Sequence, residues 1–176
     1  MEKGYVQIYT GDGKGKTTAA IGLGVRAVGN GLKVYMIQFL KSWQTGELNS
    51  LKSLEPNFKI FRFEKHRGFF WTLNEKEKSE LKEEIQEAYQ FGMKAMVDRN
   101  CDILILDEIM GAFNNGLITE EQLISLINNK PENIELVMTG RNVPEAVINL
   151  ADLITEMNPV KHYFDKNVKA RKGIEY

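Results

Sequence analysis

The chain has 176 residues, within the roughly 100–200 residues of a single domain, and a folded chain of that size buries about 70% of its unfolded surface. Apolar residues make up 43% of the sequence and charged residues 27%, as in globular proteins, which excludes a wholly disordered chain. The 23 basic and 24 acidic residues leave a formal charge of -1, so no bulk basic field attracts nucleic acid or an anionic membrane.

Cysteine usage and the N-terminus bear on the compartment. The single cysteine, Cys101, cannot form an internal disulfide, and no Cys/His cluster has the spacing of a zinc site. The first residues lack the apolar core of a signal peptide, and no apolar run approaches the ~18 residues of a membrane span. We therefore expect one cytoplasmic domain over residues 1–176, with no nucleic-acid or membrane partner.

Short apolar runs alternate with helical stretches along the chain, which is typical of a mostly parallel sheet flanked by helices. The runs expected to form strands are residues 5–9, 33–39, 58–63, 103–106, 135–139 and 153–155. Helices are expected at about 17–28, 74–97, 119–128 and 144–150; residues 41–50 are expected to be a loop, and 64–73 fit neither pattern. The polar, basic residues 158–176 are interpreted as a solvated surface segment, and the alternative is a basic tail that contacts bound substrates. The pattern predicts an α/β fold.

The segment between the first strand and the first helix is the most informative. It reads Thr-Gly-Asp-Gly-Lys-Gly-Lys-Thr-Thr over residues 10–18. Glycines let backbone N–H groups face phosphate oxygens, and the N-terminus of the following helix adds its dipole. The pattern predicts a phosphate-binding loop in which Lys16 contacts the phosphates and the Thr17 hydroxyl ligates Mg²⁺.

This loop is one residue shorter than the usual pattern. Gly11 and Gly15 enclose three residues instead of four, so Thr10 stands where the first glycine is expected. The alternative is an ordinary flexible turn that binds nothing. A dinucleotide-binding loop is excluded because its third glycine would fall at Lys16. A second glycine pattern, at residues 22–27, lies inside the helix and is attributed to close packing on the sheet.

Asp107 and Glu108 follow the most hydrophobic run of the chain, which is expected to be a strand buried on both faces. A carboxylate at the carboxyl end of such a strand lies beside the phosphate loop, where it can hold Mg²⁺ directly or through water. Without a metal, a carboxylate there would repel ATP. The alternative is a solvated pair that begins a loop. Arg141 also follows a predicted strand and is interpreted as a phosphate ligand.

With these residues in place, the chain resembles the P-loop-type ATP:corrinoid, or cob(I)alamin, adenosyltransferases from its first strand to its last residue. The short loop at 11–18 is itself a mark of that family. The other matching motifs are Gln38-Phe39-Leu40-Lys41 with Gly46-Glu47, Gly68-Phe69-Phe70-Trp71, Leu106-Asp107-Glu108, Thr139-Gly140-Arg141, Ala151-Asp152-Leu153 with Thr155-Glu156-Met157, and the C-terminal Val160-Lys161-His162 and Ala170-Arg171-Lys172-Gly173-Ile174-Glu175-Tyr176.

The resemblance implies a RecA-like P-loop fold, a homodimer, Mg²⁺, and ATP and a corrinoid as substrates. It implies transfer of the 5′-deoxyadenosyl group to the cobalt of a reduced corrinoid with release of triphosphate, in adenosylcobalamin biosynthesis or salvage. Reduced flavin or a flavoprotein is the implied electron donor. The candidate ATP-binding residues are Gly11, Asp12, Gly13, Lys14, Gly15, Lys16, Thr17, Thr18 and Arg141, and the candidate metal ligands are Thr17, Asp107 and Glu108.

The resemblance also gives a role to the segment around residue 70. The family presses two aromatic side chains on the lower corrin face, which excludes axial ligands and makes four-coordinate cobalt(II) easier to reduce. Phe69 and Trp71 match these positions and join Lys16 as candidate catalytic residues, whereas Phe70 is expected to pack inward. An aromatic trio is more often core. Here the trio interrupts the strand–helix pattern in a glycine-containing loop. This position and the family match favour contact with the corrinoid over packing in the core.

Two other functions remain open at this point. A P-loop ATPase or kinase would use Glu108 as a base and release phosphate or diphosphate. A nucleotide-gated binding or corrinoid-delivery module would not turn over. His66 and His162 make no metal pattern, and Cys101 is interpreted as a small core residue. The sequence leaves cobalamin, cobinamide and an a,c-diamide precursor as possible acceptors.

Overall fold

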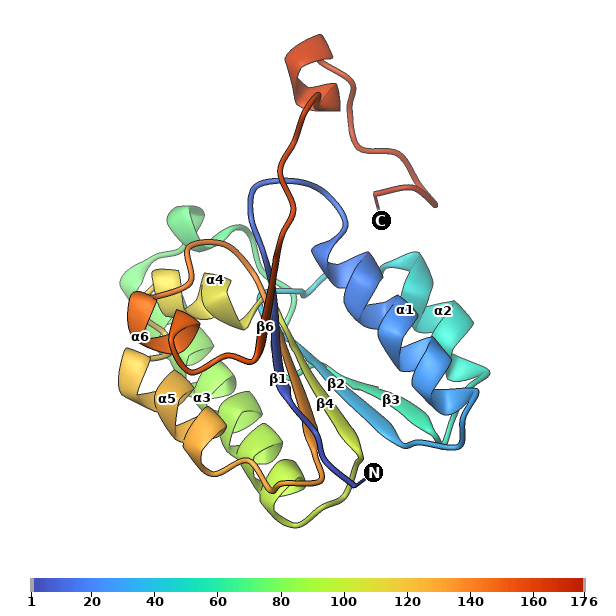
Figure 1. The fold of residues 1–176 in the computed structure, drawn as a ribbon. Coiled ribbons are helices and arrows are strands. Elements are labelled where there is room, and N and C mark those ends of the chain that lie inside the picture. The colour runs from blue at the N-terminus through green and yellow to red at the C-terminus, as the bar shows by residue number, and fades with distance from the viewer. Residues whose placement is uncertain (1, 176) are drawn as a thin grey trace.

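A parallel sheet forms the centre of the structure, a computed structural model that describes residues 2–175 (Figure 1). Six strands run in the spatial order β3-β2-β4-β5-β1-β6, and each pair of neighbours is parallel. Their bounds are β1 (Val6–Thr10), β2 (Val34–Gln38), β3 (Phe58–Phe61), β4 (Ile103–Asp107), β5 (Glu135–Thr139) and β6 (Leu153–Glu156). The parallel α/β fold expected from the sequence is confirmed.

Helices cover both faces of the sheet, as a parallel sheet requires (Figure 1). One face carries α1 (Lys16–Val28) and α2 (Gly46–Lys52), and the other carries α3 (Glu75–Val97), α4 (Ile109–Asn114), α5 (Glu120–Asn128) and α6 (Glu145–Ile148). Two short 3₁₀ helices, η1 (Phe70–Thr72) and η2 (Tyr163–Lys166), lie in the connecting segments. Within residues 2–175, none of the helices combines the length and the apolar character needed to cross a membrane.

Local sequence explains the main elements. All five residues of β4 are buried, which accounts for its continuous apolar run. The long helix α3 begins at Asn74, whose side chain accepts a hydrogen bond from the Glu77 amide while the Glu77 side chain accepts one from the Asn74 amide. This capping box satisfies two amide groups that the first turn leaves without helical partners.

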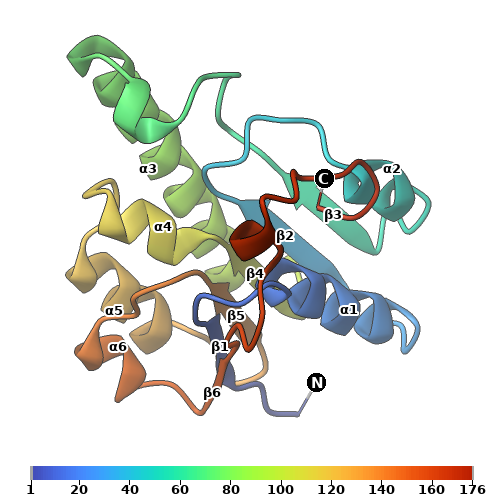
Figure 2. The same ribbon diagram turned by 90° about the horizontal axis from the view of Figure 1, so that it is seen from above.

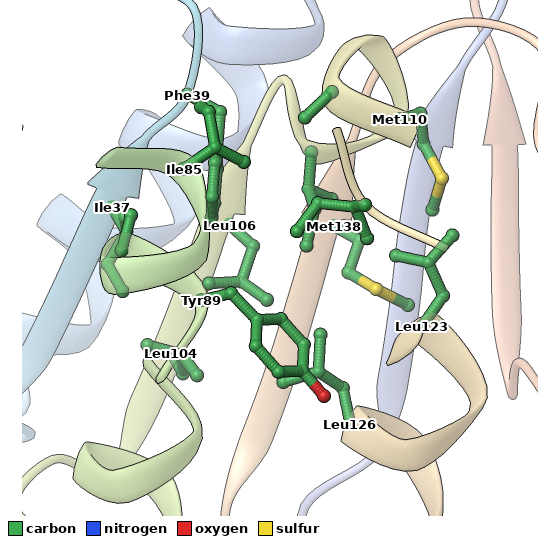
Figure 3. Close-up of a cluster of buried hydrophobic side chains, with 14 of the residues drawn as sticks. Ile37, Phe39, Ile85, Tyr89, Leu104, Leu106, Met110, Leu123, Leu126 and Met138 are labelled. Carbon is green, nitrogen blue, oxygen red and sulfur yellow. The ribbon is translucent and has the colours of Figure 1, made fainter. Parts of the chain in front are cut away.

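The larger part of the core lies between the sheet and helices α3, α4 and α5. Figure 3 shows Tyr89 of α3 and Leu126 of α5 packed toward Leu104 of β4 and Met138 of β5, and all four side chains are buried. Cys101 belongs to the same buried cluster, which confirms that it is a core residue, and burial raises the pKa of its thiol to about 12. A smaller cluster joins the opposite face of the sheet to α1.

The two glycines inside α1 have different surroundings. A Cβ at Gly24 would lie 2.4 Å from Cε2 of the buried Phe58 ring, so α1 approaches the sheet at a point where only glycine fits. A Cβ at Gly22 would meet nothing within 4 Å. Close packing therefore explains Gly24, and the same explanation is wrong for Gly22.

The structure corrects several expected boundaries. Residues 41–50 were expected to be a loop but contain the start of α2, and α4 directly follows β4 where no helix was expected. Both helices have seven residues or fewer, too short for an apolar period to emerge. The third strand ends at Phe61, before residue 63, and α6 spans only Glu145–Ile148 of the expected 144–150.

All six strands end at the same edge of the sheet because they are parallel. The segments that follow β1, β2, β4 and β5 therefore meet there, and each carries residues singled out in the sequence. Figure 2, which looks down on this edge, shows the C-terminal segment crossing above the strand ends toward α2. The start of β1 lies at the opposite end of the sheet (Figure 1).

Candidate functional site

The loop between β1 and α1 has the backbone that its glycines predict. Gly11 and Gly15 have φ angles of 95° and 118°, in the region that favours glycine. Gly13 is constrained by a close contact instead: its amide donates to the Met157 carbonyl at 2.6 Å, and a Cβ there would lie 2.6 Å from that same oxygen. The end of β6 thus braces the loop, and side chains at these three positions would deform it.

Lys16, the first residue of α1, points its ammonium back over the loop. Its Nζ donates to the Gly11 carbonyl at 2.6 Å and to the Gly13 carbonyl at 2.9 Å. Burial lowers the pKa of Lys16, and the nearby Arg141 guanidinium lowers it further. Arg141 itself contacts Asp12 of the loop, with 3.2 Å between Nε and Oδ1. Two cations therefore converge on the loop, as binding of a polyanion requires.

Asp107, at the end of β4, is fully buried and accepts four hydrogen bonds. Its Oδ1 accepts from the Thr17 hydroxyl at 2.9 Å and from the Thr139 hydroxyl at 2.7 Å. Its Oδ2 accepts from Lys41 Nζ at 2.5 Å and from Gln38 Nε2 at 3.2 Å. The donors come from α1, from the ends of β2 and β5 and from the residues after β2, so the strand order itself brings this cluster together.

Thr17 and Asp107, two of the three predicted metal ligands, are thus in direct contact. A hydroxyl and a carboxylate oxygen are hard donors of the kind that Mg²⁺ prefers. The Lys41 ammonium lies 3.2 Å from Thr17 Oγ1 and 2.5 Å from Asp107 Oδ2, so a positively charged group already contacts both of these oxygen atoms. The donor set therefore fits a cation. In the described part of the chain no cluster of three or more His, Cys, Asp or Glu side chains could hold a metal alone, so phosphates and water would complete the shell.

Glu108, the third predicted ligand, is placed differently. It adopts the left-handed conformation, with a φ of 62°, and a Cβ at Gly111 would lie 2.8 Å from its Oε1, so its carboxylate lies against α4. Burial raises the pKa of Glu108, and the charge of Asp107 raises it further. The structure brings Thr17 and Asp107 together directly and leaves Glu108 beside them.

A cavity of about 690 Å³ opens over the loop, within the range of small-molecule sites. Its walls come from loop residues 12–18, from Lys41 and Arg141, from the start of α2, and from the C-terminal segment, which contributes His162 and residues 173–175. Lys14 ties that segment to the loop: its Nζ donates to Glu175 Oε1 at 3.0 Å and to the Ile174 carbonyl at 3.2 Å. The C-terminal segment, expected to be merely solvated, therefore forms one wall of the cavity.

The aromatic segment before α3 presents two rings to solvent. Phe69 is 59% exposed and Trp71 is 77% exposed, and their rings stack with centroids 4.7 Å apart at an angle of 3°. Between them, Phe70 packs against the core, as expected, and the buried Leu73 anchors the following residues. The pair is therefore an exposed aromatic platform and not part of the core.

A smaller cavity of about 180 Å³ lies beside this platform. Its lining includes both rings together with Trp43, Glu64 and Arg67. Burial raises the pKa of Glu64 to about 7, although the hydrogen bond that Glu64 accepts from the Leu40 amide lowers it. Arg67 fixes the segment to α3 through a two-pronged contact with Glu84, one prong of which joins Nη2 and Oε1 at 2.9 Å.

The residues after β2 connect the two cavities. Lys41 lines the larger cavity, whereas its neighbours Leu40 and Ser42 line the smaller one. The sequence placed Lys41 only within a matching motif, without a role of its own. Its position just after β2, the strand next to β4, was the signal that could have placed Lys41 beside Asp107.

The fold and the loop first define the class of protein. A parallel sheet with a glycine-rich phosphate loop between β1 and α1 is a RecA-like P-loop fold. The crystal structure of the flagellar accessory protein FlaH from Methanocaldococcus jannaschii superimposes with a TM-score of 0.54 at 15% identity, over 89% of this chain and 72% of that one. That likeness concerns the fold alone.

Sequence comparisons then give the family. The model described as ATP:corrinoid adenosyltransferase BtuR/CobO/CobP matches residues 2–176. The corrinoid adenosyltransferase of Escherichia coli K12 is 35% identical, and the corrinoid adenosyltransferase CobA of Salmonella typhimurium is 36% identical, each over 99% of this chain and 87% of the relative. A corrinoid adenosyltransferase of Pseudomonas aeruginosa is 32% identical over 99% of this chain and 85% of its own. This chain belongs to the corrinoid adenosyltransferase family and is a transferase.

Proposed function

We propose that this protein transfers the 5′-deoxyadenosyl group of ATP to the cobalt of a reduced corrinoid, cob(I)alamin or a precursor, and releases triphosphate. The observation that carries the proposal is that Lys41 lines the cavity over the phosphate loop while its chain neighbours, Leu40 and Ser42, line the cavity beside the exposed aromatic platform. Two substrates can therefore bind side by side, as a group transfer between them requires. We further propose a single-domain, homodimeric enzyme whose electron donor is reduced flavin or a flavoprotein.

The loop and its cations account for the nucleotide half of the reaction. Residues 11–18 and Arg141 would bind the triphosphate, with Lys16 exchanging its two carbonyl partners for phosphate oxygens. Thr17 and Asp107, with Glu108 alongside, would hold Mg²⁺, which supplies charge stabilisation to the phosphates when bound. The short loop fits a nucleotide bound in the reverse sense, with the loop around the far phosphates and C5′ directed toward the corrinoid.

In the transfer itself, the cobalt(I) electron pair attacks C5′ and forms the cobalt–carbon bond. The bond between C5′ and its oxygen breaks, and that electron pair leaves with the triphosphate. Negative charge therefore develops on the leaving group, next to the loop amides and Lys16. Groups fixed in advance around developing charge usually contribute more to catalysis than any other single effect. Lys16 is thus proposed as a catalytic residue.

The aromatic platform accounts for the corrinoid half. We propose that Phe69 and Trp71 cover the lower face of the corrin and exclude water and the nucleotide base from cobalt. Cobalt(II) then loses its axial ligand and accepts an electron more easily. Exposed, stacked rings are suited to this task because contact with a flat macrocycle buries them.

The proposal is tested by mixing the protein anaerobically with Mg²⁺, ATP and chemically reduced cob(I)alamin and following the corrinoid spectrum. A light-sensitive adenosylcobalamin spectrum is expected. Lys16→Ala should slow its formation by roughly 100-fold or more, the usual effect of removing a group that stabilises developing charge. Lys94→Ala, exposed in the last turn of α3, is the matched control and should leave the rate unchanged. Hydrolysis of ATP to ADP with an unchanged corrinoid spectrum would instead support an ATPase.

A further inference from the structure

The cation position between Thr17 and Asp107 is filled by a side chain of the protein itself. The buried Asp107 carboxylate accepts two hydrogen bonds on each oxygen, and Lys41 is the one cation among its four donors. The ammonium contacts both predicted metal ligands, at 2.5 Å from Asp107 Oδ2 and 3.2 Å from Thr17 Oγ1. A magnesium ion bound to the same two oxygens would occupy the same space.

Two of the three other donors around Asp107, Gln38 and Thr139, are held by further hydrogen bonds. Gln38 cannot turn its amide away, because Arg62 donates to Gln38 Oε1 from Nε at 2.8 Å and from Nη2 at 2.6 Å. The buried Thr139 hydroxyl accepts from the Glu108 amide at 2.9 Å while it donates to Asp107. These contacts leave both groups no alternative position.

Lys41 differs from these donors in its mobility and exposure. Its side chain is 24% exposed, lines the larger cavity, and extends from the segment that follows β2 on four flexible carbons. A rotation of that side chain would take the ammonium from Asp107 into the cavity, where the nucleotide phosphates are proposed to bind. Lys41 is therefore the donor that can leave.

We propose that Lys41 is an internal counter-ion, which occupies the metal position in the nucleotide-free protein and moves to a phosphate oxygen when Mg²⁺ enters with ATP. The proposal rests on the Mg²⁺–ATP site proposed above. It makes metal binding conditional on the nucleotide. Free Mg²⁺ would have to displace an ammonium that then needs a new anion close to Lys16 and Arg141, because Glu47, a carboxylate beside it in the same cavity, is already paired with Arg62. With ATP bound, the triphosphate supplies that anion.

Binding of Mn²⁺, measured through the EPR signal of the free ion, tests the proposal without catalysis. The wild-type protein should bind Mn²⁺ weakly in the absence of ATP. Lys41→Met removes the charge but keeps the length of the side chain, and it should bind Mn²⁺ alone at least ten-fold more tightly. Asp107→Asn in the Lys41→Met background should abolish that gain. Lys41→Gln serves as a second uncharged variant if the methionine variant does not fold.

Two controls separate this effect from a general change of charge. Lys41→Arg keeps a cation and should bind Mn²⁺ as weakly as the wild type. Lys14→Met removes another lysine from the same cavity, one that is paired with Glu175 and not with Asp107, and should also leave Mn²⁺ binding weak. If both uncharged Lys41 variants bind Mn²⁺ no better than the wild type while Mn²⁺–ATP binds, Lys41 is not a counter-ion and the nucleotide site stands. Failure of the wild type to bind Mn²⁺–ATP would overturn both proposals.

Discussion

Replacing Trp71 by alanine tests whether the aromatic platform serves a ligand or the fold. The indole is 77% exposed and stacks on the Phe69 ring, with centroids 4.7 Å apart. Loss of one ring from such a pair costs about 0.5–1.5 kcal/mol of stability. A buried tryptophan replaced by alanine would cost about 3–5 kcal/mol. We therefore expect the free energy of unfolding to fall by roughly 1 kcal/mol or less.

The expected effect on corrinoid binding is larger. A large aromatic side chain contributes up to roughly 250 Å² of surface, so about 190 Å² of Trp71 is exposed, and a flat ligand over one ring face would bury about half of that. At about 25 cal/mol per Å² this amounts to roughly 2 kcal/mol, or about 30-fold in Kd. Trp71→Ala should therefore weaken corrinoid binding much more than it weakens the fold.

Two measurements on the same samples decide the question. Anaerobic calorimetry with cob(II)alamin, in the presence of ATP, gives the corrinoid Kd, and urea denaturation gives the free energy of unfolding. Tyr5→Ala is the matched control, because Tyr5 is 45% exposed but lies just before β1 at the opposite end of the sheet, and it should leave the Kd unchanged. A loss of about 3 kcal/mol in stability with an unchanged Kd would exclude a role in binding and make Trp71 a structural residue.

Two further predictions concern the fold and its pH dependence. Gly24→Ala should lower the free energy of unfolding by about 1–3 kcal/mol, because the new Cβ meets the Phe58 ring. Gly22→Ala should raise it by up to about 1 kcal/mol, because a Cβ there meets nothing within 4 Å. Equal effects of the two substitutions in urea denaturation would contradict the packing of α1. Burial raises the pKa of Glu64 to about 7, so the folded protein binds a proton more tightly than the unfolded chain does. The resulting stability is fully present below the unfolded pKa of about 4.5 and is lost as the pH rises through 7. The total loss is about 3 kcal/mol. Glu64→Gln should therefore flatten the dependence of the free energy of unfolding on pH between about pH 5 and 7. The control Glu83→Gln, at an exposed position, should leave that dependence unchanged. If the free energy of unfolding of the wild type did not change over this range, Glu64 would be solvated.

The sequence was sufficient for the fold wherever a segment was long or strongly apolar. The buried run of β4 and the capping box at the start of α3 determine their elements locally, and the six strands of a mostly parallel sheet were expected from short apolar runs. Helices α2 and α4 escaped prediction because each has a turn or two, and tertiary contacts, not local periodicity, hold them. Helix α2 packs against β3, and α4 packs against β5.

The candidate site was predictable as a set of residue types but not as a set of contacts. Position after a parallel strand was enough to expect Asp107 beside the phosphate loop, and the hydrogen bond from Thr17 confirms that placement. Their roles as metal ligands stay predictions. The placement of Lys41 between them depends on the path of the chain after β2, and the wall formed by residues 173–175 depends on the ion pair between Lys14 and Glu175. Neither follows from local sequence, because both join segments distant along the chain.

The fate of the three phosphates of ATP distinguishes adenosyl transfer from hydrolysis. The protein is mixed anaerobically with Mg²⁺, cob(I)alamin and ATP labelled in both the adenosine and the γ-phosphate, and the products are separated in the dark. Adenosyl transfer predicts one equivalent of adenosine label in the corrinoid fraction for each equivalent of γ-label recovered as intact triphosphate. Recovery of the γ-label as orthophosphate, with the adenosine label in ADP, would contradict attack at C5′ and with it the proposed reaction.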